Sequence, residues 1–143
     1  NGSLPEAVDR LARAGLDSIR ISLNSAREDK HRLYYRPRGF SLADVRESIR
    51  VMKRHGRHVS LNYFILPGCT DDPAEFAAPC ELVATCRPDF IQLRNLNMDP
   101  ELYLRVIEHQ PAGPPLGIRT WLERLRQEHP SLRFGYFNPP LHP

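Results

Sequence analysis

The sequence predicts an α/β fold in which parallel strands alternate with helices. Three stretches alternate apolar and polar side chains as strands do, and segments with helical spacing of apolar residues separate them. No two-residue hairpin signal lies between these strands, so we expect parallel pairing with right-handed crossovers. Each strand also keeps one polar face, unlike strands that helices cover on both sides. We therefore expect a barrel or partial barrel with the polar side chains in its lumen.

The N-terminal part of the chain contains a helix, a strand and a charged segment. Residues 5–14 place their apolar side chains at helical spacing, and Gly15 supplies the stop. Residues 18–25 then alternate between apolar and polar side chains, as a half-buried strand does. Residues 26–35 are charged and compatible with a helix. We expect His31 in this segment to be exposed.

The central segment gives the clearest helix and the next strand. Residues 41–55 begin with a capping-box pattern, carry an apolar stripe and end at a glycine, so we expect a helix. Residues 59–65 alternate as a strand. Asp72 followed by a proline predicts an N-cap, with Glu75 closing a second capping box. Pro79 should kink or split the helix that follows.

The last part of the chain continues the pattern less regularly. Residues 90–97 predict a third strand with one apolar and one polar face. Helical spacing recurs over 101–108 and 116–129, with a proline-rich loop between them. Residues 132–137 fit a short fourth strand, and the tail at 138–143 holds too much proline to extend it.

Composition narrows the class of protein. The 20 basic and 17 acidic side chains are interleaved along the chain, so the net charge of +3 indicates a solvated surface and argues against a nucleic-acid partner. No apolar run approaches about 20 residues, so we expect no membrane span. No basic-then-apolar leader occurs, which favours a cytoplasmic protein. Cys69, Cys80 and Cys86 lack CxxC or CxxxCxxC spacing, so we expect free thiols and no metal site made by this chain alone.

Polar side chains recur on one face of the three main strands. They come in pairs two residues apart: Ser22 with Asn24, Ser60 with Asn62, and Gln92 with Arg94. Taken singly, each is compatible with a structural role as a satisfied hydroxyl or a strand-end amide, and Arg94 with an ion pair to Asp89 or Asp99. Because the arrangement repeats on three strands, we favour a shared binding surface. No Walker sequence, GxGxxG or nucleophile elbow occurs, so the catalytic residue is unknown.

Four stretches, in this order, resemble the radical S-adenosylmethionine (radical SAM) enzymes. Asn1-Gly2 followed by Leu4-Pro5 is similar to the end of the third barrel strand of that family. Three further stretches resemble the fourth, fifth and sixth strands of that family, in this order: IRISLNS, VSLNYFILPGCTDD and FIQLRNLN. The order and spacing of these stretches carry the resemblance, and the rest of the chain is compatible with a closing helix and strand.

The resemblance implies an α/β fold that is the C-terminal half of a partial (β/α)6 TIM-like barrel. The chain would be a single incomplete domain: barrel strands four to six with their helices in 1–109, and a closing helix, strand and proline-rich tail in 110–143. The family binds a [4Fe-4S] cluster through CxxxCxxC after its first strand, and no such motif occurs here. We therefore expect the cluster loop to lie upstream of this chain.

The resemblance also implies which residues contact S-adenosylmethionine. These are Ser22, Asn24, Gln92, Arg94 and Gly68. The first two would lie near the methionine and ribose, and the next two near the adenine or the carboxylate. The glycine and the acid that the family carries after strand five are partly matched by Gly68 and Glu75, and Glu75 is assigned first to the capping box.

The implied reaction is reductive cleavage of S-adenosylmethionine at the cluster, followed by hydrogen abstraction from a substrate by the deoxyadenosyl radical. Ser60 and Asn62 would face this substrate, a small molecule or a peptide, and an external electron donor would be needed. This chain alone would be inactive. Two other classes stay open: a fragment of another (β/α)-barrel enzyme, or a non-catalytic binding module that keeps the fold.

Overall fold

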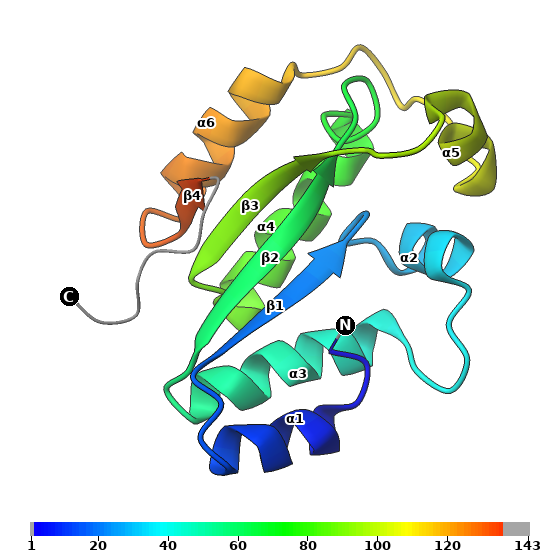
Figure 1. Ribbon diagram of the computed structural model, residues 1–143. Coiled ribbons are helices and arrows are strands. Elements are labelled where there is room, and N and C mark those ends of the chain that lie inside the picture. The colour runs from blue at the N-terminus through cyan, green and yellow to red at the C-terminus, as the bar shows by residue number, and fades with distance from the viewer. Residues whose placement is uncertain (1, 136–143) are drawn as a thin grey trace.

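The computed structural model describes residues 2–135 and forms a parallel sheet with helices against one face (Figure 1). The strands are β1 (Ser18–Leu23), β2 (His58–Ile65), β3 (Phe90–Asn95) and β4 (Arg133–Gly135). The helices are α1 (Pro5–Arg13), α2 (Glu28–Tyr35), α3 (Leu42–Arg54), α4 (Pro73–Cys86), α5 (Pro100–Val106) and α6 (Ile118–Glu128). The described strands pair in parallel in the order β1-β2-β3-β4, which confirms the predicted α/β fold.

One face of the sheet is apolar and packs on helices. Ile21, Leu61 and Ile91 lie side by side in register and are at most 1% exposed. Apolar residues of α1, α3, α4 and α6 join them in one core, in which Trp121 is fully buried. Because side chains alternate along a strand, the polar residues between these apolar ones share the opposite face. The two-faced character expected from the sequence is therefore present.

A second, smaller apolar cluster lies at the carboxyl ends of the strands. Cys69, Tyr103 and Ile107 are its buried members, and Tyr34 packs against them. The cluster joins α2, which follows β1, to α5, which follows β3, so these two short helices lie together beyond the strand ends (Figure 1). This packing fixes the surroundings of the polar residues at that end of the sheet.

Both predicted N-caps are present at α3 and α4, but one predicted capping-box acid differs. Ser41 and Asp44 form the predicted capping box at α3, where the Asp44 carboxylate accepts a hydrogen bond from the Ser41 amide at 2.8 Å. Asp72 caps α4 by accepting a hydrogen bond from the Ala74 amide at 2.8 Å. The prediction that Glu75 closes a second capping box is wrong, because its carboxylate turns instead toward the loop after β1.

Two other expectations are corrected by packing. Pro79 does not split α4, which runs without interruption from Pro73 to Cys86 with Pro79 buried in it. His31 is not exposed: it is 2% exposed, and its ring centroid lies 4.7 Å from that of Tyr35 and 6.2 Å from that of Phe40. Contacts with distant or aromatic neighbours therefore override the local sequence pattern at both positions.

Several element ends shift relative to the predictions. The third strand ends at Asn95, two residues earlier than expected, and α6 is shorter at both ends than the predicted helix over 116–129. The end of the predicted fourth strand and the tail at 138–143 lie outside the described residues. No described helix combines the length and the apolar composition that crossing a membrane requires.

Gly2 allows the N-terminal segment to lie directly against β1. Its φ is +70°, in the left-handed region that favours glycine. A Cβ atom at this position would lie 2.8 Å from the Cδ1 atom of Ile21, closer than two carbons can approach. The backbone angle and the contact together explain the glycine.

Candidate functional site

The predicted binding residues meet at the carboxyl ends of β1, β2 and β3. Ser22, Asn62 and Gln92 are register partners and form a row across the polar face, here called the polar row. The Asn62 amide donates a hydrogen bond to the Ser22 hydroxyl at 3.4 Å. Asn62 Oδ1 and Gln92 Oε1 are buried and accept no hydrogen bond from residues 2–135. Because buried polar atoms are usually satisfied, these two acceptors are available to donors of a ligand.

Ser60 lies on the same face, two residues before Asn62 on β2. It is 1% exposed, and its hydroxyl has no hydrogen-bond partner in the described part of the chain. Its register partners are Arg20 and Phe90, so it stands one row deeper than the polar row. The polar face therefore has unsatisfied groups at two levels.

A cavity of about 300 Å³ opens beside the polar row. It is lined by Tyr34, Asn62, Phe64, Arg94, Asn95, Leu96, Asn97 and Met98. The ion pair considered for Arg94 is not formed with any described residue: Asp89 pairs with Lys53 at 2.6 Å, and Asp99 caps α5. The Arg94 guanidinium thus remains available for a carboxylate or another acceptor on a ligand.

Aromatic side chains form a part of this cavity that sequence reasoning missed. Tyr34 and Phe64 meet edge to face with their ring centroids 5.9 Å apart. Phe64 is the register partner of Arg94, so the strand alternation already placed it on the polar face. Tyr34 comes from α2, and no local pattern could bring it to β2. The cavity therefore combines amides, a guanidinium and two rings.

Asn24 and Gly68 use their donors within the protein. The Asn24 amide donates hydrogen bonds to the Lys30 carbonyl at 3.2 Å and to the Tyr103 hydroxyl at 3.3 Å, although its Oδ1 atom is buried without a partner. Gly68 donates its amide to Asp71 Oδ1 at 2.6 Å. The only group of Asn24 left for a ligand is its carbonyl oxygen, and Gly68 shapes its turn with a φ of +84°.

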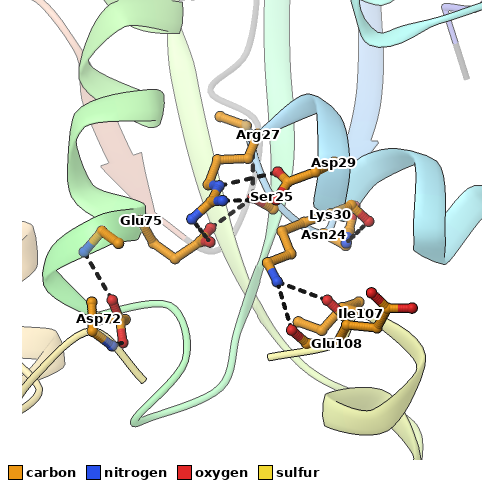
Figure 2. Close-up of polar contacts among 12 residues, drawn as sticks. Asn24, Ser25, Arg27, Asp29, Lys30, Asp72, Glu75, Ile107 and Glu108 are labelled. Carbon is orange, nitrogen blue, oxygen red and sulfur yellow. Dashed lines mark hydrogen bonds and ion pairs between the residues drawn. The ribbon is translucent and has the colours of Figure 1, made fainter. Parts of the chain in front are cut away.

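A buried polar network fixes the loop after β1 (Figure 2). Glu75 of α4 accepts a hydrogen bond from the Ser25 hydroxyl at 2.7 Å and pairs with Arg27 at 3.3 Å. Burial is the largest influence on Asp29 and opposes its ionisation. The hydrogen bonds from Arg27 and the Lys30 amide, together with the charges of these two residues, outweigh it, so the pKa of Asp29 lies below its usual value. The network therefore holds the residues that follow Ser22 against the start of α4.

A buried lysine attaches the same loop to α5. Lys30 Nζ donates hydrogen bonds to the carbonyls of Ile107 at 2.7 Å and Glu108 at 3.1 Å, at the end of that helix (Figure 2). A cation is favourable there because the last carbonyls of a helix have no partners within the helix. Together with the Glu75 network, this contact joins α2, α4 and α5 around the strand ends.

Two buried aspartates attach the segment between α5 and α6 to the loop after β2. Asp71 Oδ2 accepts a hydrogen bond from the Gly117 amide at 2.9 Å, and its carbonyl accepts one from the Leu116 amide at 2.8 Å. Asp72 Oδ2 accepts one from the Ala112 amide at 2.8 Å. Sequence reasoning recognised only the capping role of Asp72. The pair is a structural clamp and not a catalytic dyad, because both carboxylates are engaged with amides.

The polar groups left free at this site suit S-adenosylmethionine, whereas the cysteines of the chain do not suit an iron–sulfur cluster. Unsatisfied acceptors match the amino and hydroxyl groups of an adenosine and an amino acid, and Arg94 matches a carboxylate. The three cysteines are free: Cys69 is buried after β2, and Cys80 and Cys86 lie on α4. Burial raises the pKa of Cys69 to about 12. No group of three metal-ligating side chains in residues 2–135 contains more than one cysteine, so the described thiols do not form a cluster site.

The fold and the candidate site together define a class: parallel strands alternating with helices, with the predicted binding residues on one polar face of the sheet. The family model of the Radical SAM superfamily matches residues 1–78, more than half of the chain. The chain belongs to the radical SAM superfamily.

Two known proteins extend this comparison. The chain is 35% identical over 111 residues to a GTP 3',8-cyclase from Alkaliphilus oremlandii (strain OhILAs), which covers 77% of the chain and 29% of the cyclase. It resembles the crystal structure of a radical SAM methyltransferase from Sphaerobacter thermophilus with a TM-score of 0.60 and 20% identity, over 97% of the chain and 40% of that protein. The chain thus spans well under half of each relative, and the methyltransferase supports the fold alone.

Proposed function

We propose that this chain forms the part of a radical SAM enzyme that holds S-adenosylmethionine and one side of the substrate. In this family, S-adenosylmethionine and a reduced [4Fe-4S] cluster supply hydrogen-abstracting chemistry once both are bound. The residues of this chain would bind the cofactor, orient the substrate and exclude water from the reacting groups. An external electron donor would reduce the cluster.

The observation that carries the proposal is the polar row with its unsatisfied acceptors. Ser22, Asn62 and Gln92 lie in register, and two of their carbonyl oxygens are buried without partners among the described residues. Leaving such groups unsatisfied costs free energy, which a ligand with several donors would recover. S-adenosylmethionine carries an ammonium, two ribose hydroxyls and an adenine amine as donors.

Individual roles follow from position. Ser22 and the Asn24 carbonyl would contact the methionine and ribose, since both lie at the end of β1. Gln92 and Arg94 would contact the adenine or the carboxylate, and the free guanidinium of Arg94 supports the second of these contacts. Gly68 would contribute the shape of its turn, because its amide is already bonded to Asp71.

Ser60 and Asn62 would face the substrate, a small molecule or a peptide. Both carry a buried oxygen without a hydrogen-bond partner among the described residues on the polar face, and Asn62 also lines the cavity. The cluster ligands would come from residues outside this chain, since its own thiols do not converge. The match covers only 29% of the GTP 3',8-cyclase, so the substrate of that enzyme is not assigned to this chain.

The test is a titration of S-adenosylmethionine into protein that carries the cluster, repeated with S-adenosylhomocysteine and cluster-free protein. Arg94→Ala and Ser22→Ala should each weaken binding by about tenfold, since one hydrogen bond to a charged or polar group contributes on the order of 1.5 kcal/mol. Matched controls are Arg119→Ala on α6 and Ser18→Ala at the opposite end of β1, which should bind as the wild type does.

Unchanged affinity in both site variants would overturn the assignment of these residues. Protein that never takes up a cluster and shows no affinity for either compound would favour the non-catalytic binding module, which keeps the fold without the chemistry. The cysteine arrangement of this chain is the observation that keeps this second function open.

A further inference from the structure

Three metal-ligating side chains meet between α4 and α6, in the helical layer outside the sheet. Cys80 comes from the middle of α4, Glu128 is the last residue of α6, and His129 is its C-cap. Their ligand atoms all lie within 4.8 Å of one another. No other three such side chains come this close in the part of the chain that the structure describes. The group is separate from the polar row and from every residue assigned to the cofactor.

Within the described residues, this group has no ion-pair partner for its carboxylate and leaves one imidazole nitrogen without a hydrogen bond. The Glu128 carboxylate accepts a hydrogen bond from the Cys80 thiol but forms no ion pair with a described residue. The Nε2 atom of His129 is buried without a hydrogen-bond partner within residues 2–135. Burying an unpartnered imidazole nitrogen costs free energy. A cation bound through this nitrogen would satisfy it and would give the Glu128 carboxylate an ion-pair partner.

We propose that Cys80, Glu128 and His129 bind a divalent cation of the zinc type. Thiolate, imidazole and carboxylate are the donors that zinc takes in proteins, whereas magnesium and calcium select oxygen alone. Three protein ligands leave a fourth tetrahedral position for water. Ligand atoms about 2.0–2.3 Å from one zinc lie roughly 3.5 Å apart. Rotation of the exposed Glu128 side chain and small adjustments of the half-buried Cys80 and His129 would have to bring the present atoms closer by about 1 Å.

The local charge favours a dication. On metal binding the Cys80 thiol would release its proton to solvent, so that the thiolate and the Glu128 carboxylate contribute two negative charges. Arg124 is a cation whose charge acts on the Cys80 thiol, and its guanidinium carbon lies 4.4 Å from the centroid of the Phe76 ring. Once that proton is released, the two ligand charges and the charge of Arg124 sum to about one negative charge, which a dication would offset.

The metal would fasten α6 to α4. The Leu132 amide donates a hydrogen bond to the His129 carbonyl, and β4 begins at the next residue, so the position of the last described strand depends on the end of α6. A metal bound to both helices would cross-link them and so fix that end, because its binding free energy is added to the folded state. The inference concerns the stability of this part of the fold and does not depend on the proposed function.

The experiment is a titration of untagged, metal-free full chain with Co²⁺, followed by absorption, and with Zn²⁺, followed by the thermal unfolding midpoint. Co²⁺ should bind one to one and produce a thiolate-to-metal charge-transfer absorption, and Zn²⁺ should raise the midpoint. Cys80→Ser should abolish that absorption. Glu128→Gln and His129→Gln should each weaken Co²⁺ affinity by at least about tenfold, since even second-shell partners contribute that much.

Matched controls are Cys86→Ser, which removes a second thiol of α4, and Glu123→Gln, which removes another acid of α6. Both should bind Co²⁺ and Zn²⁺ as the wild type does. Charge-transfer absorption that persists in Cys80→Ser would overturn the proposal. Should that variant fail to fold, unchanged affinity in the variants of the exposed Glu128 and of His129 would overturn it equally.

Discussion

Ser25→Ala and Glu75→Ala should destabilise the protein by less in combination than the sum of their separate effects. The Ser25 hydroxyl donates to Glu75 Oε2 at 2.7 Å, and these residues are 4% and 6% exposed. A hydrogen bond to a charged group contributes about 1.5–3 kcal/mol, and a buried group left without its partner costs a similar amount. Each single variant should lose about 2–3 kcal/mol, and we expect a coupling energy of about 1.5–2 kcal/mol.

The assay is urea unfolding followed by the fluorescence of Trp121, the one tryptophan of the chain, which is fully buried. With a slope of about 2 kcal/mol per molar urea, each single variant should lower the midpoint by roughly 1 M. The exposed ion pair between Glu47 and Arg50 is a matched control, with an expected coupling of about 0.3–0.5 kcal/mol. A coupling for Ser25 and Glu75 no larger than that of the control pair would refute the reasoning.

The remaining predictions also concern stability. Asp72→Ala should lower the free energy of unfolding by about 2 kcal/mol, because it removes the N-cap bond to Ala74 and the bond to Ala112; urea unfolding with a loss below about 0.5 kcal/mol would contradict this. Burial lowers the pKa of His31 below 6.5. The buried neutral imidazole therefore makes its full contribution to the free energy of unfolding above pH 6.5, and this contribution is lost as the pH falls below 6.5. Stability should therefore drop between pH 7.5 and 5.5, and less in His31→Gln; equal slopes would contradict the prediction.

The faces of the strands could be predicted from the sequence because alternation is a local property. Ile21 and Ser22 differ in polarity and are neighbours, so their opposite faces follow once the segment is a strand. The N-cap at Asp72 could be predicted for the same reason, since its partner Ala74 is two residues away. Parallel pairing followed from the absence of hairpin signals, and it placed Ser22 beside Asn62.

Contacts between distant segments could not be predicted. Glu75 has the spacing of a capping-box acid, but its stronger partner, Ser25, is 50 residues away in sequence and reaches it only in the folded chain. His31 lies among charged neighbours, and its burial depends on how α2 packs. Arg94 stood near two acids in sequence, and both acids have other partners in the structure.

The clamp formed by Asp71 and Asp72 accepts hydrogen bonds from main-chain amides alone. The groups it holds are the amides of Ala112, Leu116 and Gly117, and no side chain of that segment takes part. Apart from Gly117, whose φ of +85° favours glycine, substitutions along the segment should therefore not disturb the clamp as long as the amide is kept. An inserted or deleted residue would move at least one amide out of reach. Homologous chains could therefore differ in the other side chains of the segment between α5 and α6 and still keep α6 in the same position, provided that the length of this segment is kept.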